Sequence, residues 1–135
     1  MNKYTLSFIL FCVFSLILIP SGSCLMSPHP IELYERGIEQ LNSTARNVRA
    51  STATQEVFLS LIKKFPYSPL GYLGMSYCYR HDAYVGAQRY DIEFLKNNAY
   101  PLALKALRLG PSIRAVHENY AFFQELFFIG EGENF

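Results

Sequence analysis

Apolar residues beyond position 30 recur at the spacing of an α-helix. Ile31, Tyr34, Ile38 and Leu41 form the first such stripe, and charged residues occupy the positions between them. No segment alternates apolar and polar residues in the manner of a half-buried strand. The pattern therefore predicts an all-α domain over residues 31–130, followed by a short C-terminal tail at 131–135. Its predicted helices cover residues 31–41, 54–65, 69–81, 84–94, 101–109 and 113–130.

Prolines and small polar residues mark the ends of these helices. Pro69 and Pro101 each stand where a first helical turn begins, because a proline there loses no intrahelical hydrogen bond. The polar stretch from 42 to 54 is predicted to contain the first turn between helices. Residues 84–94 form either a further helix or a continuation of the helix before them. The remaining predicted caps and breaks are Thr54, Pro66, Ser68, Asn97-Asn98, Gly110-Pro111 and Ser112.

The first 24 residues have the order of a secretory signal peptide. One cation, Lys3, precedes an apolar run, and Pro20 is followed by small residues up to Cys24. The apolar run spans roughly 14 residues, fewer than the about 20 that a transmembrane helix needs. We therefore expect a removed signal first and a retained N-terminal anchor second. Residues 25–30, with two prolines, are predicted to form a linker.

Two processing routes are open in this segment. Ser21 and Ser23 offer the small side chains that a signal peptidase requires. Gly22-Ser23-Cys24 resembles the end of a bacterial lipobox, which would make Cys24 the acylated first residue, although Ser21 replaces the usual aliphatic residue. If Cys24 is lipidated, the domain is held at a membrane and Cys78 has no disulfide partner. If Cys24 stays free, a bond between Cys24 and Cys78 can form in an oxidising compartment.

Charge and composition exclude several classes of function. The 135 residues carry 12 Lys and Arg against 11 Asp and Glu, so the formal net charge of +1 becomes zero once Lys3 leaves with the signal. A domain without a basic surplus lacks the electrostatic footprint of a nucleic-acid-binding protein. Aromatic residues, at 16%, are too abundant for a disordered chain, and three cysteines are too few for a disulfide scaffold.

Two helix ends match each other and, with their flanks, resemble tetratricopeptide repeats. Phe65-Pro66-Tyr67-Ser68 and Gly110-Pro111-Ser112 each follow an apolar helix and precede an aromatic-rich one. That family closes each pair of antiparallel helices at a proline, so the resemblance implies hairpins stacked as a short α-α superhelix. The positions that match are Tyr72, Met75, Ser76 and Tyr79 after Pro66, Phe58 and Leu61 before it, Ala99, Ala103 and Ala106 before Pro111, and His117, Tyr120 and Ala121 after it.

The chain departs from the family pattern in its spacing. Pro66 and Pro111 are 45 residues apart, whereas one repeat of the family is about 34 residues long. Residues 82–98 are therefore expected to be an insertion of about three helical turns. The family's Trp/Leu-Gly pair is absent at its registered place, and Leu73-Gly74 offers a second register. The sequence around Pro66 is also similar to repeats of bacterial envelope lipoproteins.

The resemblance implies one binding surface, a concave groove lined by the first helices of successive pairs. Tyr77, Arg80 and Phe122 would give this groove aromatic and cationic groups that suit an extended or helical peptide. The alternative is that its apolar members are covered by neighbouring helices. The residues that match the groove are Leu70, Leu73, Tyr77, Arg80, Ala115, Glu118, Phe122 and Glu125.

The sequence offers no constellation for catalysis or for binding a metal or cofactor. His29, His81 and His117 lack the spacing of metal ligands, and no Gly-rich phosphate loop or nucleophile motif is present. Cys78 lies within a predicted helix, where we expect a buried, unreactive thiol. The His81-Asp82 pair is expected at a helix end, where a histidine interacts favourably with the helix dipole, rather than in a catalytic pair.

These features favour an exported helical-repeat scaffold or adaptor that has no enzymatic activity and binds a protein partner in the periplasm or cell envelope. The chain has fewer helical hairpins than the minimum of about three repeats that a stable repeat protein usually needs. Self-association or docking on a larger envelope complex would therefore cover the exposed ends of the helix stack. The alternative function is a small-ligand-binding accessory lipoprotein of a solute-uptake system. A wide polar groove favours the adaptor, and a closed apolar pocket among Tyr77, Phe94 and Phe122 favours the ligand binder.

Overall fold

In the computed structural model of the chain, the described residues are 29–46, 48–84 and 90–132, with side chains up to residue 128. The predicted signal peptide, Cys24 and most of the predicted linker lie outside these residues. Every element within them is helical and none is a strand, which confirms the all-α class. The elements are α2 (Pro30–Ser43), α3 (Thr52–Lys64), α4 (Pro69–Tyr84), α5 (Ile92–Phe94), the π-helical turn η1 (Leu95–Ala99), α6 (Tyr100–Leu109) and α7 (Arg114–Gly132).

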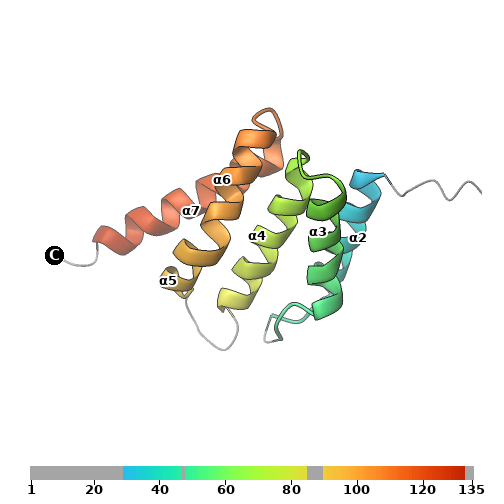
Figure 1. Cartoon of the computed structure of the whole chain (residues 1–135). Helices are drawn as coiled ribbons and strands as arrows, with labels where there is room; N and C mark the ends of the chain where they lie inside the picture. Colours follow the sequence, from blue (N-terminus) through green and yellow to red (C-terminus); the bar gives the residue numbers. More distant parts are fainter. Residues whose placement is uncertain (1–28, 47, 85–89, 133–135) are drawn as a thin grey trace, which may run out of the picture.

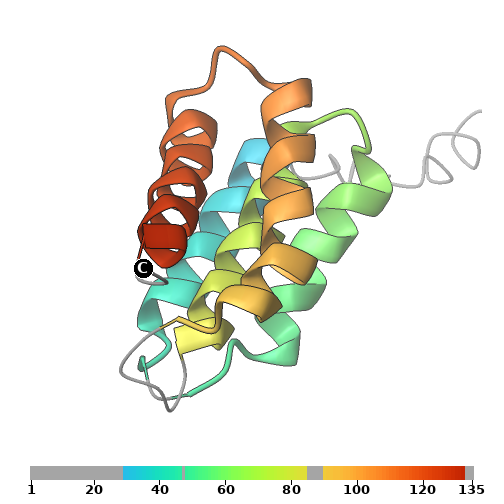
Figure 2. The same ribbon diagram turned by 90° about the vertical axis from the view of Figure 1, so that its left-hand side faces the viewer.

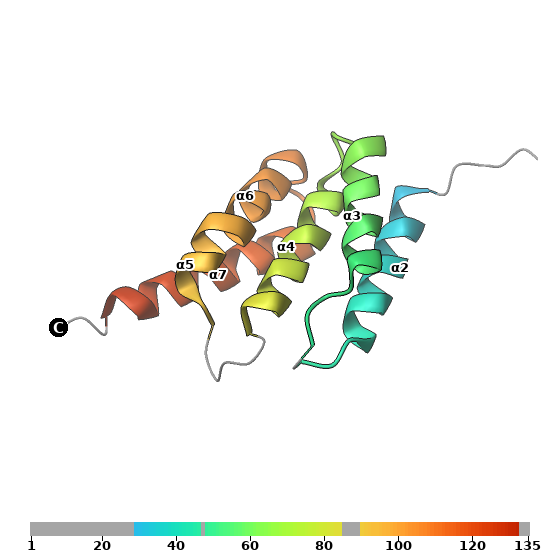
Figure 3. The same ribbon diagram turned by 60° about the horizontal axis from the view of Figure 1, so that its bottom comes forward.

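The long helices run antiparallel in chain order, and α4 lies at the centre of the molecule (Figure 1). In the view of Figure 2, α3 and α6 lie on one side of α4, with α2 and α7 on the other. Figure 3 shows α2 and α7 at opposite ends of the row. Because α4 contacts α2, α3, η1, α6 and α7, its buried residues surround the helix instead of forming one stripe. They are Gly71, Leu73, Gly74, Met75, Ser76, Cys78 and Ala83.

The ring of Phe58, on α3, fills the space where α2, α3 and α4 meet. Phe58 is fully buried, and the ring of Tyr34 packs against it at a centroid distance of 6.2 Å. A Cβ added at Gly37 of α2 would lie 2.5 Å from this ring, and one added at Gly74 of α4 would lie 2.1 Å from it. The missing side chains at both positions therefore let two helices approach the third around a single aromatic residue.

The turns after α3 and α6 have the same backbone geometry. Phe65 has φ −132° and ψ 65°, and Gly110, 45 positions later, has φ −138° and ψ 62°. Each donates its N–H to the carbonyl four residues earlier and accepts a hydrogen bond from the N–H three residues later. Buried residues of the two preceding helices recur with the same offset of 45 positions, as Thr54 and Ala99, Phe58 and Ala103, and Leu61 and Ala106. The second hairpin is thus built in the register of the first.

The predicted helix break at Asn97-Asn98 is wrong, because helical structure continues without interruption from Ile92 to Leu109. A proline inside a regular helix clashes with the preceding turn and removes a hydrogen-bond donor. Before Pro101 the helix widens into the π turn η1, in which the Tyr100 N–H donates to the Leu95 carbonyl. The Asn98 side chain, through Nδ2, donates to the Phe94 carbonyl at 2.9 Å, so the asparagine sustains the helix that it was expected to end.

The observed start of α3 and the observed end of α4 also differ from the predicted ones. Ser51 caps α3, because its Oγ accepts a hydrogen bond from the Thr54 N–H at 3.1 Å, whereas Thr54, the predicted cap, is buried within the helix. The sequence could not separate these two hydroxyl residues by type, since both suit a cap. Helix α4 continues to Tyr84, three residues beyond the predicted end.

The region predicted as an insertion, residues 82–98, is only partly helical where it is described. Asp91 precedes the helix and caps α5, since its Oδ1 accepts from the Phe94 N–H at 3.0 Å. The Asp91 N–H donates to the Ala83 carbonyl at 3.3 Å, which ties the start of α5 to the end of α4. Residues 85–89, part of the predicted 84–94 helix, lie outside the described residues.

Helix α7 begins at Arg114, so Ile113 occupies the cap position predicted for Ser112.

Replacing Gly74 by alanine tests the packing around Phe58. In an exposed helix interior this change gains about 1 kcal/mol from helix propensity. Here the new Cβ would meet Phe58 Cδ1 at 2.1 Å, and such overpacking costs about 1–3 kcal/mol. We expect Gly74→Ala to lower the free energy of unfolding, measured by urea denaturation followed by circular dichroism.

The matched control combines Gly74→Ala with Phe58→Leu, which removes the ring that the new methyl group meets. The cost of Gly74→Ala should fall to less than half in the Phe58→Leu background. Equal costs in the two backgrounds would show that Phe58 does not set the spacing of these helices.

Candidate functional site

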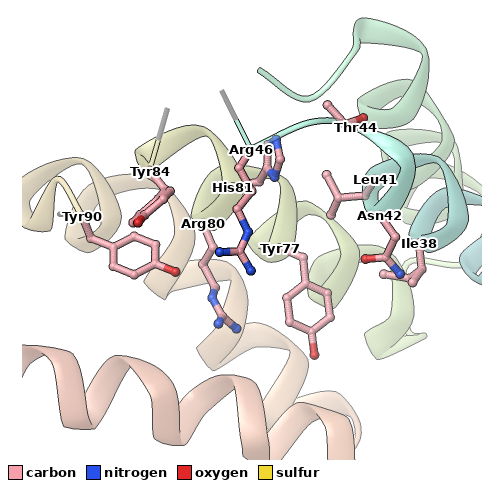
Figure 4. Close-up of a pocket in the computed structure, with 10 residues that line it drawn as sticks. All are labelled: Ile38, Leu41, Asn42, Thr44, Arg46, Tyr77, Arg80, His81, Tyr84 and Tyr90. Atoms are coloured by element: carbon pink, nitrogen blue, oxygen red, sulfur yellow. The ribbon is translucent and has the colours of Figure 1, made fainter. Parts of the chain in front are cut away.

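A cleft of about 650 Å³ opens between the C-terminal ends of α2 and α4 (Figure 4). It is exposed to solvent, with apolar residues of α2 on one side and tyrosine and cationic residues of α4 on the other. Loop residues complete its rim. The lining residues are Ile38, Leu41 and Asn42 of α2, Thr44 and Arg46 of the following loop, Tyr77, Arg80, His81 and Tyr84 of α4, and Tyr90 before α5.

The end of α4 holds the α2–α3 loop that forms part of this rim. Nε2 of His81 donates to the Val48 carbonyl at 2.7 Å. The Ala50 N–H donates to Asp82 Oδ1, also at 2.7 Å. Through these two bonds His81 and Asp82 fix the loop that carries Arg46. This part of the rim is therefore held against α4.

Arg80 is the central cation of the cleft. Its Nη1 donates to Oδ1 of Asn119 on α7 at 2.7 Å, and its guanidinium carbon lies 3.5 Å from the centroid of the Phe122 ring. The stacking and the hydrogen bond together fix the plane of the guanidinium group. Burial lowers the pKa of Arg80, while Tyr90 and Tyr77 raise it. An arginine stays protonated at neutral pH even so.

A buried hydrogen-bond chain connects Arg80 to the core. Asn119 accepts from Arg80 and, through Nδ2, donates to Ser76 Oγ at 3.0 Å. The Ser76 hydroxyl in turn donates to the Ala99 carbonyl at 3.1 Å. Ser76 and Asn119 are at most 1% exposed, so each polar group removed from water has a partner. Three elements, α4, α7 and η1, are joined by this chain.

Tyr77 lies beside Arg80 and bridges α4 to α7. Its hydroxyl donates to the Ala115 carbonyl at 3.4 Å, and the Arg80 guanidinium lies 5.4 Å from the centre of its ring. Burial raises the pKa of Tyr77, Arg80 lowers it and Glu118 raises it. The phenol is therefore a neutral hydrogen-bonding group at pH 7.

The structure brings together part of the groove that the sequence predicted. Tyr77 and Arg80 line the cleft. Phe122 contacts two lining residues, because Arg80 stacks on its ring and Tyr90 meets it edge to face at a ring-centroid distance of 5.3 Å. Ala115 takes part through its backbone carbonyl. These contacts join α4 to α7.

Other predicted groove residues lie elsewhere. Leu73 is fully buried and packs with Ala106 and Val116, so neighbouring helices cover it and it offers no surface to a ligand. Glu118 is exposed and pairs with Arg114 at 2.6 Å. Leu70 is half-buried and Glu125 is exposed, and neither lines the cleft.

Several cleft residues were not predicted from the sequence. The wall from α2 was interpreted only as an apolar stripe, and nothing in its pattern indicates a cleft. Asn119 had a usable signal, because it is a polar residue on the buried stripe of Val116 and Phe123. A polar residue in such a position must find a buried partner. Tyr90 had no such signal, since the sequence placed it in the predicted 84–94 helix, whereas it lies before α5, which begins at Ile92.

The described residues contain no group of three or more metal-ligating side chains. Cys78 is fully buried, and this burial, with a smaller contribution from Asp82, raises the pKa of its thiol to about 12. His29 accepts a hydrogen bond at the start of α2, and His117 contacts the Pro111 carbonyl. Over the same residues, no helix combines the length and the apolarity needed to cross a membrane.

The buried thiol of Cys78 makes stability sensitive to alkaline pH. In the unfolded chain the thiol ionises near pH 8.5, whereas in the folded chain its pKa is about 12. Between these values the folded state binds more protons, so the free energy of unfolding falls as the pH rises, by up to about 1.4 kcal/mol per unit. Urea denaturation from about pH 8 to pH 10, below the range of most tyrosines, should show this fall.

Cys78→Ala is the control for this titration. The variant should lose some stability at pH 7 but show a flatter dependence over the same pH range. An equally steep dependence in the variant would assign the effect to other groups, of which Tyr34 is the first to examine because burial raises its pKa strongly.

Asn119→Ala should unfold more easily than the parent chain. It leaves Arg80 and Ser76 without their shared partner, at a cost of about 1–3 kcal/mol. Gln124→Ala is the matched control, because Gln124 is an exposed residue of the same helix whose side chain donates to the Tyr120 hydroxyl, so a change within about 0.5 kcal/mol is expected. Equal losses in urea denaturation would show that the buried chain contributes nothing specific.

Comparison with known proteins adds no family to this description. No protein-family model, curated protein or solved structure matches the chain. Its likeness to tetratricopeptide repeats stays a resemblance, supported by paired turns and buried positions. What the protein does is therefore argued from its cleft and from the chemistry of the residues that line it.

Proposed function

We propose that this protein is an exported helical-repeat adaptor that binds a protein partner through the cleft between α2 and α4. The observation that carries the proposal is the cleft itself, which is open, about 650 Å³ in volume and lined largely by polar side chains. Open, mixed surfaces with tyrosine and arginine are typical of protein interfaces. No catalytic arrangement is needed for such a role.

The stacking of the helices supports a repeat architecture similar to tetratricopeptide repeats. Two hairpins share the geometry of their turns at Phe65 and Gly110. The cleft lies between α2 and α4, and α2 and α7 lie on the same side of α4 (Figure 2). In the proposed repeat architecture, α2, α4 and α7 are the first helices of successive pairs. In repeat proteins that surface is the usual place for binding extended segments of other chains.

The alternative, an accessory lipoprotein that binds a small solute, receives less support. That function requires a closed apolar pocket among Tyr77, Phe94 and Phe122. Phe94 instead packs edge-to-face on Tyr79, at a centroid distance of 5.9 Å, and Phe122 is stacked by Arg80. The cleft also lacks the enclosure by which small-ligand sites bury most of their ligand.

Export and membrane attachment are proposed from residues 1–24. The apolar run after Lys3 and the small residues before Cys24 favour secretion. Lipidation at Cys24 or a retained N-terminal segment would hold the domain at a membrane. The partner is then expected in the periplasm or cell envelope, as one chain of a larger complex or as a second copy of this one.

Site-specific photo-crosslinking tests the adaptor function. A benzophenone amino acid replaces Tyr84, at the cleft, and in a second variant Tyr67, which is 86% exposed in the α3–α4 turn at the other end of α4. Irradiation of intact cells should give a protein adduct of defined mass from position 84 and little or none from position 67.

The result should also depend on the cleft and not on the probe. Adding Asn42→Ala, which changes another lining residue at an exposed position, should weaken the adduct from position 84. Identical adducts from both positions, or no protein adduct from position 84, would contradict the proposed adaptor function.

A further inference from the structure

We propose that the cleft recognises an acidic segment of the partner and that Arg80 is the residue that receives its carboxylate. This inference rests on the adaptor function and names the chemistry of the partner. It concerns one part of the cleft, where Arg80 lies between the rings of Tyr77 and Tyr90 (Figure 4).

The cleft carries charge of one sign. Among the described residues that line it, Arg46 and Arg80 are cationic and none is an aspartate or glutamate. The whole chain is nearly neutral, so this grouping is a local property of the cleft. A concave site with cations of one sign attracts and orients negatively charged groups.

Arg80 holds its charge without a counter-charge from its own chain. Among the described residues no carboxylate lies within ion-pairing distance of Arg80, and the polar groups beside it are the amide of Asn119 and the hydroxyls of Tyr77 and Tyr90. A half-buried guanidinium in such surroundings has lost part of its hydration without gaining an ion pair. A guanidinium group has five N–H donors, and Asn119 receives one of these bonds. Donors that Asn119 and Tyr90 leave open can donate to a carboxylate from outside the chain.

The guanidinium group is also held in place before any ligand arrives. Phe122 covers one of its faces at 3.5 Å, and Asn119 holds one edge. A preorganised arginine loses less side-chain entropy on binding than a free surface arginine does. The hydroxyl groups of Tyr84 and Tyr90 line the same cleft and can donate to further acceptors on the ligand.

A peptide suits this site better than a broad polyanionic surface does. Arg80 is recessed and half-buried, whereas a phospholipid bilayer or a nucleic acid meets cations that project from a face. The exposed positions of α2, the helix that supplies Ile38, Leu41 and Asn42 to the cleft, carry three carboxylates against one cation, Arg36. The carboxylates are Glu32, Glu35 and Glu39. These carboxylates repel an extended anionic surface but leave room for a short acidic segment that enters the cleft.

Peptide binding by the full-length chain in detergent micelles tests the inference. The probe is a fluorescein-labelled peptide of alternating Glu and Gly, and its partner probe has Gln in place of every Glu. Fluorescence anisotropy should show binding of the Glu peptide that weakens at high salt. The Gln peptide should bind at least about tenfold more weakly, as expected for the loss of a charge-assisted hydrogen bond.

Three variants locate the interaction. Arg80→Gln should weaken binding of the Glu peptide by about tenfold. Arg46→Gln, at an exposed loop position whose change leaves folding unaffected, should weaken it by about two- to threefold. Arg108→Gln removes the same charge from an exposed position on α6 outside the cleft and should leave binding unchanged.

Three results would overturn the inference. They are equal binding of the Glu and Gln peptides, equal loss of binding in the Arg80→Gln and Arg108→Gln variants, and full displacement of the peptide by an equal concentration of inorganic phosphate. The last would assign the site to a small free anion. Should Arg80→Gln fail to fold, the comparison of the two peptides and the Arg46→Gln variant still decide the question.

The crosslinking experiment separates this inference from the adaptor function. If the adduct at position 84 persists in the Arg80→Gln chain and the Glu peptide does not bind, the adaptor stands and the acidic specificity falls. If the peptide binds through Arg80 and no protein adduct forms, the adaptor function falls and the carboxylate site stands.

Discussion

The contact between the Phe58 ring and the backbones of Gly37 and Gly74 is the constraint on which the rest of the structure depends. A fully buried aromatic ring on α3 occupies the space that side chains on α2 and α4 would otherwise fill. Three helices are thereby fixed at close range, because neither glycine can be enlarged without moving the ring. The position of α4 relative to α2 follows from this contact, and so does the gap at their C-terminal ends.

The cleft is a consequence of that placement. Helix α4 is covered by other helices on most sides. The part of it that borders the cleft, near Tyr77 and Arg80, is where its polar side chains reach solvent. Asn119 stabilises the half-buried guanidinium of Arg80, because its amide oxygen accepts from Arg80 while its Nδ2 is held by Ser76, which itself donates to the Ala99 carbonyl. The result is an arginine that is held in position at the edge of the cleft.

The spacing of apolar residues and the positions of the prolines predicted the helices correctly where interactions within a few residues decide the structure. The 3.6-residue period located every long helix, and the two proline turns were recognised as equivalent. The errors arose where a second contact reversed a local preference. Asn97-Asn98 carries residues of low helix propensity, yet the π turn and the bond from Asn98 to Phe94 keep the helix intact. Leu73 matched a groove position by register but is enclosed by α6 and α7.

The sequence by itself determined the helical class, the paired turns and the placement of Tyr77 and Arg80 on one face of one helix. These features depend on backbone hydrogen bonding and helical periodicity, which act within a few residues. Only the tertiary structure decided that Asn119 would hold Arg80, that Leu73 would be enclosed and that the end of α2 would form the opposite wall of the cleft. The physical reason is that helix crossings are set by side-chain volume at the crossing, here one phenylalanine between two glycines, and an apolar pattern records polarity but not volume.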